Sequence, residues 1–207
     1  VLTEVSFKVF PAPPQTATLA VELSSVADAV IAIQRMTVAP LDLDALDFAP
    51  TDTGATLWVR MGGLPDALPS RLARIEAMLG GGTVLDDDAA AAHWAGQRAF
   101  AWQPAGTALV KVATVPGQLE ALDAQLAAAG AVRFYSVGGN LAWIGWPEQI
   151  EALDQLLQAK GISGLVLAGI VDRPLIGRQP GGPFLERIQQ TLDPAGRFPA
   201  LLGAVVG

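Results

Sequence analysis

The stretch that decides the predicted fold is residues 109–168, LVKVATVPGQLEALDAQLAAAGAVRFYSVGGNLAWIGWPEQIEALDQLLQAKGISGLVLA. It begins with a valine-rich segment, 109–114, that is typical of a strand. Pro116 then favours a helix start, because its fixed φ suits the first helical turn. Three leucines recur along that helix at the spacing of a single face, namely Leu119, Leu122 and Leu126. The segment therefore predicts a strand followed by an amphipathic helix.

The rest of this stretch predicts a hairpin, a second helix and a last strand. The apolar segments 132–137 and 141–146 flank two glycines and an asparagine, which tolerate the positive φ of a tight turn. Pro147 favours a helix start and Gly161 a helix end. The apolar residues 164–168 at the end of the stretch predict a last strand. The predicted order of residues 109–168 is therefore βαββαβ.

The same order is predicted earlier in the chain. Strands are expected at 18–23, 46–49, 55–61 and 83–85. Ser24 or Ser25 can cap the first helix, and the second helix stops at Gly80, Gly81 and Gly82. These glycines follow a helix rather than precede one, so we interpret them as a helix end and not as a phosphate-binding loop.

Together the two repeats predict an α+β protein of tandem ferredoxin-like βαββαβ units, with antiparallel sheets and helices on one face. Before them, Val5, Phe7 and Val9 alternate with polar residues and predict a further strand, which a proline-rich linker ends. The predicted parts are a remnant strand and linker at 1–15, units at 16–85 and 105–170, a connecting helix at 86–104, and a loop, closing helix and tail at 171–207.

Composition excludes several classes of function. The 207 residues are 51% hydrophobic and only 16% charged, and the net charge is -7, which argues against a nucleic-acid partner. No apolar run reaches the roughly 18 residues that a transmembrane helix needs. The chain has no cysteine, and a cytoplasmic location fits this composition best.

The sequence contains no self-contained catalytic motif, and we assign no catalytic residue from it. His93 is the only histidine, which excludes a site with several histidine ligands, and we expect no metal site. The adjacent acids 86–88 cannot converge on one cation and are interpreted as a helix cap. Four arginines remain as candidates for holding a carboxylate, although most charged side chains are simply solvated: Arg60, Arg133, Arg173 and Arg178.

Several segments in chain order resemble the FAD-binding subunit of glycolate oxidase, in the vanillyl-alcohol-oxidase-type flavoprotein family. The ending, 192–198 (LDPAGRF), is the most specific of them. The others are 1–9 (VLTEVSFKV), 57–60 (LWVR), Gly81 and Gly82 before the acidic run, Trp94 with Arg98, and Gly138 and Gly139 before Ala142 and Trp143.

The resemblance implies the substrate-side cap of an FAD-dependent enzyme that oxidises a small 2-hydroxyacid such as glycolate to the 2-oxoacid. A missing amino-terminal domain would hold most of the FAD, with Val1 and Leu2 contributing backbone groups, so this chain alone is expected to be inactive. Arg133 is our first choice for binding the anionic substrate and Arg60 the second. The resemblance also implies companion flavin and iron-sulfur subunits, through which the protein would associate peripherally with the inner membrane.

Another class of function stays open at this point. The same fold suits a non-catalytic small-molecule-binding or structural subunit, because fold does not determine function. Two positions depart from the family's pattern, with Val137 in place of an aromatic residue and Ala142 in place of an arginine, and these departures favour that alternative.

Overall fold

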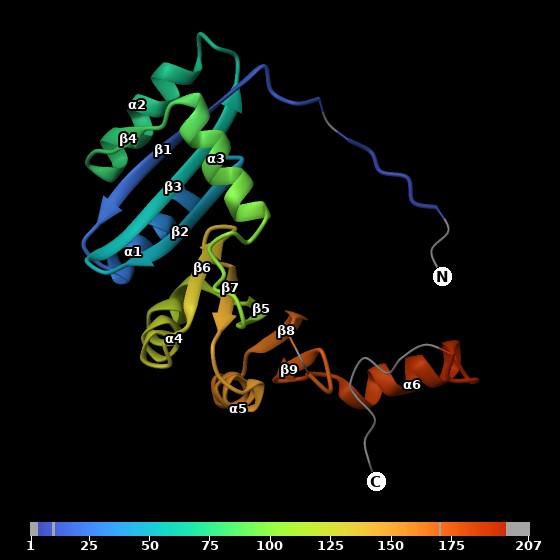
Figure 1. Cartoon of the computed structure of the whole chain (residues 1–207). Coiled ribbons are helices and arrows are strands. Elements are labelled where there is room, and N and C mark those ends of the chain that lie inside the picture. The colour runs from blue at the N-terminus through green and yellow to red at the C-terminus, as the bar shows by residue number, and fades with distance from the viewer. Residues whose placement is uncertain (1–3, 10, 170, 198–207) are drawn as a thin grey trace.

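The computed structural model describes residues 4–9, 11–169 and 171–197. In this part of the chain it shows a mixed α+β protein with one nine-stranded antiparallel sheet and six helices (Figure 1). None of the described helices has the length and apolar character needed to cross a bilayer.

The first half of the sheet has the strand order β4-β1-β3-β2. Its elements are β1 (Gln15–Leu23), α1 (Val26–Thr37), β2 (Ala45–Thr51), β3 (Gly54–Gly63), α2 (Leu68–Leu79) and β4 (Thr83–Val84). The helix α3 (Asp87–Arg98) and a loop then lead to the second half.

The second half has the order β6-β7-β5-β8-β9, which reverses the order of the first half and adds one strand. Its elements are β5 (Ala108–Ala113), α4 (Pro116–Ala128), β6 (Val132–Ser136), β7 (Leu141–Trp146), α5 (Ile150–Lys160), β8 (Ser163–Ala168) and β9 (Leu175–Gly177). The helix α6 (Gly182–Leu192) follows and lies apart from the sheet (Figure 1).

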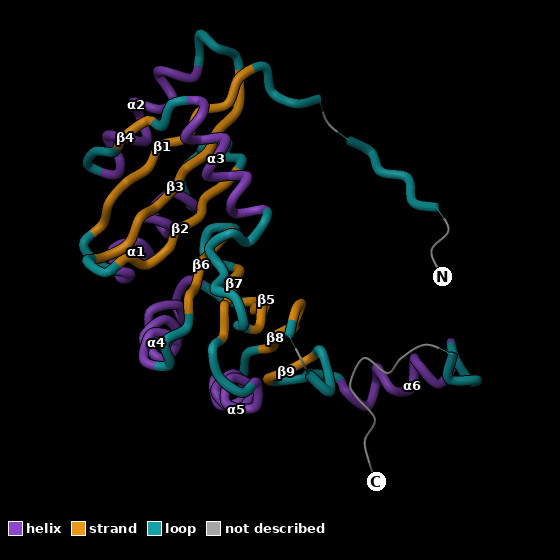
Figure 2. Tube along the Cα trace, in the orientation of Figure 1, coloured by secondary structure: helices purple, strands orange, loops and turns teal. Residues whose placement is uncertain are grey.

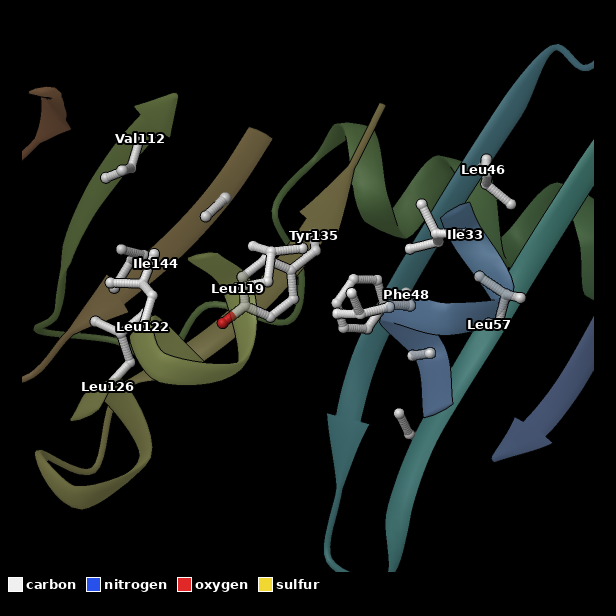
Figure 3. Packing of buried hydrophobic residues seen from close by; sticks show 14 of the residues in the cluster. Ile33, Leu46, Phe48, Leu57, Val112, Leu119, Leu122, Leu126, Tyr135 and Ile144 are labelled. Atoms are coloured by element: carbon white, nitrogen blue, oxygen red, sulfur yellow. The ribbon is translucent and has the colours of Figure 1, made fainter. Parts of the chain in front are cut away.

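The two halves meet where β2 pairs with β6, through the single partner pair Phe48 and Tyr135. The two rings are stacked, with centroids 4.6 Å apart, and both side chains are fully buried (Figure 3). The prediction of antiparallel strands is confirmed, but the prediction of separate sheets is wrong, because this pairing makes one continuous sheet. We call the β2–β6 junction the seam.

The hydrophobic core lies between one face of the sheet and the helices α1, α2, α4 and α5. Alternate strand residues such as Leu57, Ile144 and Val112 point to this face and are buried against helix residues such as Ile33 and Leu122 (Figure 3). This is the arrangement expected from the period of two along a strand and the apolar stripe along a helix.

The helix α3 lies on the opposite face, so the prediction that the helices share one face does not extend to it. Trp94 Nε1 donates a hydrogen bond of 2.9 Å to Thr18 Oγ1, and the His93 ring stacks on Trp58 at 4.4 Å. Thr18 and Trp58 alternate with core residues along β1 and β3, so their side chains point away from the core. In the first half of the sheet, α3 therefore covers part of the face opposite the core.

Most local predictions from turn and cap residues are confirmed, but Pro147 lies before α5, which begins at Ile150 after the N-cap Gln149. Gly80 ends α2 in the left-handed conformation, at φ 81°, as expected for a glycine helix stop. Asp86 caps α3, because its carboxylate accepts the backbone N–H of Ala89 at 2.8 Å. The predicted hairpin between β6 and β7 is also present, with Gly138 and Gly139 at positive φ.

Two expectations concern the ends of the chain. Residues 4–9, within the segment predicted as a remnant strand, form no strand with the rest of the described chain and are exposed. The loop predicted at the start of 171–207 contains β9, which pairs with β8. The closing helix α6 is amphipathic as predicted, but none of its residues is buried.

Candidate functional site

A cleft of about 450 Å³ lies over the seam, between the sheet face opposite the core and the segment formed by α3 and the loop that follows it. That loop runs from the end of α3 past β6 and β7 (Figure 2). The aromatic residues that line the cleft are Trp94, Phe100, Trp102, Phe134 and Trp143. The polar residues are Asp44, Asp47, Arg60, Gln97, Arg98 and Ser136. Both halves of the sheet and the connector thus contribute to a single site.

The aromatic rings over the second half are in contact with one another. Phe100 lies 5.0 Å from Trp143 and 6.1 Å from Trp102, measured between ring centroids, and Trp102 lies 6.3 Å from Phe134. Such separations are typical of favourable aromatic pairs. The loop after α3 is therefore held on the sheet by aromatic contacts, which form one wall of the cleft.

The aromatic contacts continue across the seam onto the first half. Phe134 on β6 lies 6.2 Å from Trp58 on β3, and His93 then bridges Trp58 and Trp94 at 4.4 and 4.8 Å. Burial lowers the pKa of His93, which keeps its ring neutral at neutral pH. An unbroken series of rings thus crosses the face of the sheet.

Buried polar atoms without a hydrogen-bond partner are concentrated here. Within the described part of the chain they are Arg60 Nε, His93 Nε2, Gln97 Oε1 and Trp102 Nε1. Three of these four residues line the cleft, and His93 stacks beside it. Leaving a buried polar group unpaired costs about 1–3 kcal/mol, so native proteins rarely keep one without a reason. Their concentration at one place makes the cleft the candidate binding site.

Asp47 is the most perturbed carboxyl group of the cleft. Burial raises its pKa to about 6, although its Oδ1 accepts the backbone N–H of Val137 at 3.1 Å, which acts in the opposite direction. A carboxyl group with this pKa is partly protonated near neutral pH and is suited to exchanging a proton with a ligand.

The backbone is strained at two positions that line the cleft. Phe100 and Val137 have φ values of 52° and 56°, and they are the non-glycine residues with positive φ in the described part of the chain. A β-branched residue such as Val137 disfavours this conformation strongly. Backbone strain of this kind clusters at functional sites, because the surrounding structure must hold it in place.

Of the two arginines expected to bind substrate, the structure places Arg60 in the cleft. Its guanidinium lies 5.6 Å from the centroid of the Trp94 ring, and its Nε is one of the unpaired atoms. Arg60, Trp94 and Arg98 also line a second hollow of about 410 Å³ on the other side of α3. Arg60 and Arg98 are thus the two cations that line both open spaces.

The structure places Arg133 on the opposite face of the sheet. Its Nε and Nη2 bind the two carboxylate oxygens of Asp123 on α4 at 2.6 and 3.1 Å, and its Nη1 donates to the carbonyl of Ala131. The Tyr135 hydroxyl donates to the same carboxylate at 2.7 Å. Arg133 does not line the cleft, and these contacts give it a role in anchoring α4 to the sheet.

The expected cofactor contacts at Val1 and Leu2 lie outside the described residues. The described helix starts do not fit an FAD pyrophosphate, which needs several backbone N–H donors without negative charge nearby. The starts of α1, α3 and α5 carry acidic residues, and those of α2, α4 and α6 carry proline, which has no N–H. None of the described helix starts therefore suits an FAD pyrophosphate.

Sequence reasoning missed Asp47, Gln97 and Trp102. Asp47 sits inside an apolar strand segment, and a charged residue there is a signal that could have been noticed. Gln97 and Trp102 belong to the connector, which was expected only to join the two units. Their partners come from strands far away in the sequence, so no local pattern reveals them.

Asp47→Asn is expected to stabilise the protein at pH 7 by about 2 kcal/mol, since a shift of one pKa unit corresponds to about 1.4 kcal/mol. The folded state holds the Asp47 proton more tightly than the unfolded state, whose pKa is near 3.8. The protonated Asp47 therefore stabilises the folded state below pH 4, and this stabilisation is lost as the pH rises to about 6. Urea unfolding at several pH values measures it.

The matched control is Asp44→Asn, which changes an exposed carboxylate of the same cleft and should leave the stability unchanged within about 0.5 kcal/mol. Parallel stability profiles for the parent and Asp47→Asn between pH 4 and 7 would show that Asp47 is not perturbed.

In comparisons with known proteins, no family model matches the chain, and no curated protein is significantly similar to it.

Proposed function

We propose that this chain is the substrate-side cap of an FAD-dependent oxidoreductase that oxidises a small 2-hydroxyacid to the 2-oxoacid. Two features support the proposal. One is the resemblance of several segments to the FAD-binding subunit of glycolate oxidase. The other is the strand order of each half, 4-1-3-2 when its first four strands are numbered along the chain, which is compatible with the proposed ferredoxin-like units. Two such units joined edge to edge present one broad face to a cofactor and its substrate.

The single observation that carries the proposal is that three residues lining the cleft have buried side-chain atoms without a hydrogen-bond partner among the described residues. Arg60 Nε and Trp102 Nε1 are hydrogen-bond donors, and Gln97 Oε1 is an acceptor. A 2-hydroxyacid is complementary to this set, because its carboxylate accepts hydrogen bonds and its hydroxyl donates one. The charge of Arg60 also strengthens a contact with a carboxylate.

In this proposal the residues of the cleft have distinct tasks. Arg60 holds the substrate carboxylate, and Gln97 orients the hydroxyl. Asp47, with its raised pKa, takes the hydroxyl proton as the substrate is oxidised. The aromatic residues exclude water from the reacting carbon. The flavin, held by other parts of the protein, supplies the hydride acceptor, and the companion subunits would carry the electrons away.

Arg60→Ala is expected to raise the KM for the 2-hydroxyacid substrate by about 10- to 100-fold in the native flavoprotein, because it removes a charge-assisted contact. The measurement is steady-state oxidation of a 2-hydroxyacid that the parent protein oxidises, together with the flavin absorbance of the purified protein. The flavin content should not change. Arg173→Ala is the control, because Arg173 pairs with Asp154 far from the cleft.

Absence of flavin from the native protein would overturn the proposal, and unchanged kinetics would remove Arg60 from the substrate site.

A second candidate function is non-catalytic binding of a small molecule. It is favoured by the fact that this chain alone forms the walls of the cleft. Ligand binding by a native protein without flavin would support this second function.

A further inference from the structure

We infer that the substrate of the cleft is a 2-hydroxyacid with an aromatic side chain, rather than a two- or three-carbon acid. The inference rests on the proposed function, because it names the substrate class of the same site. It starts from the size of the cleft, its aromatic lining, and the position of its charged groups.

The cleft is too large for glycolate or lactate alone. Its volume is about 450 Å³, which lies within the range of about 300–1,000 Å³ that is typical of pockets for much larger ligands. A two-carbon acid bound to Arg60 would leave most of this space to water. The remaining space can hold a substituent on the substrate carbon.

The lining of that space is aromatic. Phe100, Trp102, Phe134 and Trp143 come from the loop after α3 and from β6 and β7, and they are joined by ring contacts of 5.0 to 6.3 Å. Aromatic rings bind a further ring favourably through offset-stacked or edge-to-face contacts. An aliphatic substituent would bury apolar surface here but would not make these contacts.

The polar groups suit the other end of such a ligand. Arg60 on β3 and Trp94 on α3 lie together at one side of the cleft, where the guanidinium packs against the indole ring. The cleft thus combines an arginine at one side with an aromatic wall at the other, which matches an acid joined to a ring.

Direct binding to the 207-residue chain tests the inference without any flavin. Isothermal titration calorimetry should give an affinity for 3-phenyllactate that is at least tenfold higher than that for lactate, because a buried phenyl group contributes on this scale. The probe 3-phenylpropionate lacks the hydroxyl and should bind more weakly than 3-phenyllactate. Equal affinities for lactate and 3-phenyllactate, or no binding of any of these acids at millimolar concentration, would overturn the inference.

Trp143→Leu separates the aromatic wall from the polar groups. The Trp143 indole N–H is already bonded to Ser136 at 2.9 Å, so its loss leaves the unpaired donors in place. We expect about a fivefold or larger loss of 3-phenyllactate affinity and no change for lactate. Phe184→Leu on the exposed helix α6 is the control. An equal loss for both acids would argue against an aromatic pocket.

The outcome for the substrate class is distinguishable from that for the proposed function. Tight 3-phenyllactate binding to the chain, combined with a native protein that contains no flavin, would support the aromatic ligand class and contradict the oxidase function. A native flavoprotein whose flavin is reduced by glycolate but not by 3-phenyllactate would support the oxidase function and overturn the inference about the substrate class.

Discussion

Phe48→Ala is expected to lower the free energy of unfolding by about 3–5 kcal/mol, which is the usual cost of removing a fully buried phenylalanine. Phe48 is completely buried and stacks on Tyr135 at the only residue pair that joins β2 to β6 in the described sheet. The substitution removes both the packing of the ring in the core and its stacking on Tyr135 across the seam. Urea unfolding followed by circular dichroism measures the loss.

The same substitution should also weaken ligand binding, because the cleft lies over the seam and takes residues from both halves. Phe184→Ala is the matched control. Phe184 is 58% exposed on α6, and its loss should cost no more than about 0.5 kcal/mol. A loss of less than about 1 kcal/mol for Phe48→Ala would mean that the seam does not depend on this ring pair.

Arg133→Ala should destabilise the protein by about 3–5 kcal/mol, which is typical when one partner of a buried ion pair is removed. The Asp123 carboxylate, with only 8% of its side chain exposed, would be left without its cation. Burial raises the pKa of the Tyr135 hydroxyl, and the negative charge of Asp123 raises it further. The tyrosine therefore stays a neutral donor and cannot compensate the charge. Thermal and urea unfolding at pH 7 both measure the effect.

Arg173→Ala is the corresponding control for Arg133→Ala. Arg173 also pairs with an aspartate, at 2.8 Å, but 42% of its side chain is exposed. Exposed pairs contribute about 0–1 kcal/mol, so the loss should be correspondingly small. Similar losses for the two variants would show that burial does not set the strength of the Arg133 pair.

The order of the elements was predictable from the sequence because it depends on local patterns. The alternation along β6 and β7, the proline at the start of α4 and the glycines that end α2 and α5 all act within a few residues. These signals place each helix and strand. They do not specify which strand edges meet, so the seam between β2 and β6 was not predicted.

The candidate site was less predictable than the fold, and the two arginines show why. Arg133 and Tyr135 are two residues apart on β6, so both side chains point to the core face, where Asp123 on α4 meets them. Arg60 on β3 points to the other face. The sequence places both arginines on strands, but only the register of the strands and the position of α4 show which one reaches the cleft.

The strands at the two ends of the sheet have a consequence for how copies of the protein behave at high concentration. An unpaired strand edge invites other chains to extend the sheet, which leads to aggregation. Here the outermost strands are only two and three residues long, β4 at Thr83–Val84 and β9 at Leu175–Gly177. Such short strands offer few backbone groups of their own, but β4 pairs only with Leu19 and Ala20 of the nine-residue β1, so the rest of the β1 edge is where another copy can add a strand.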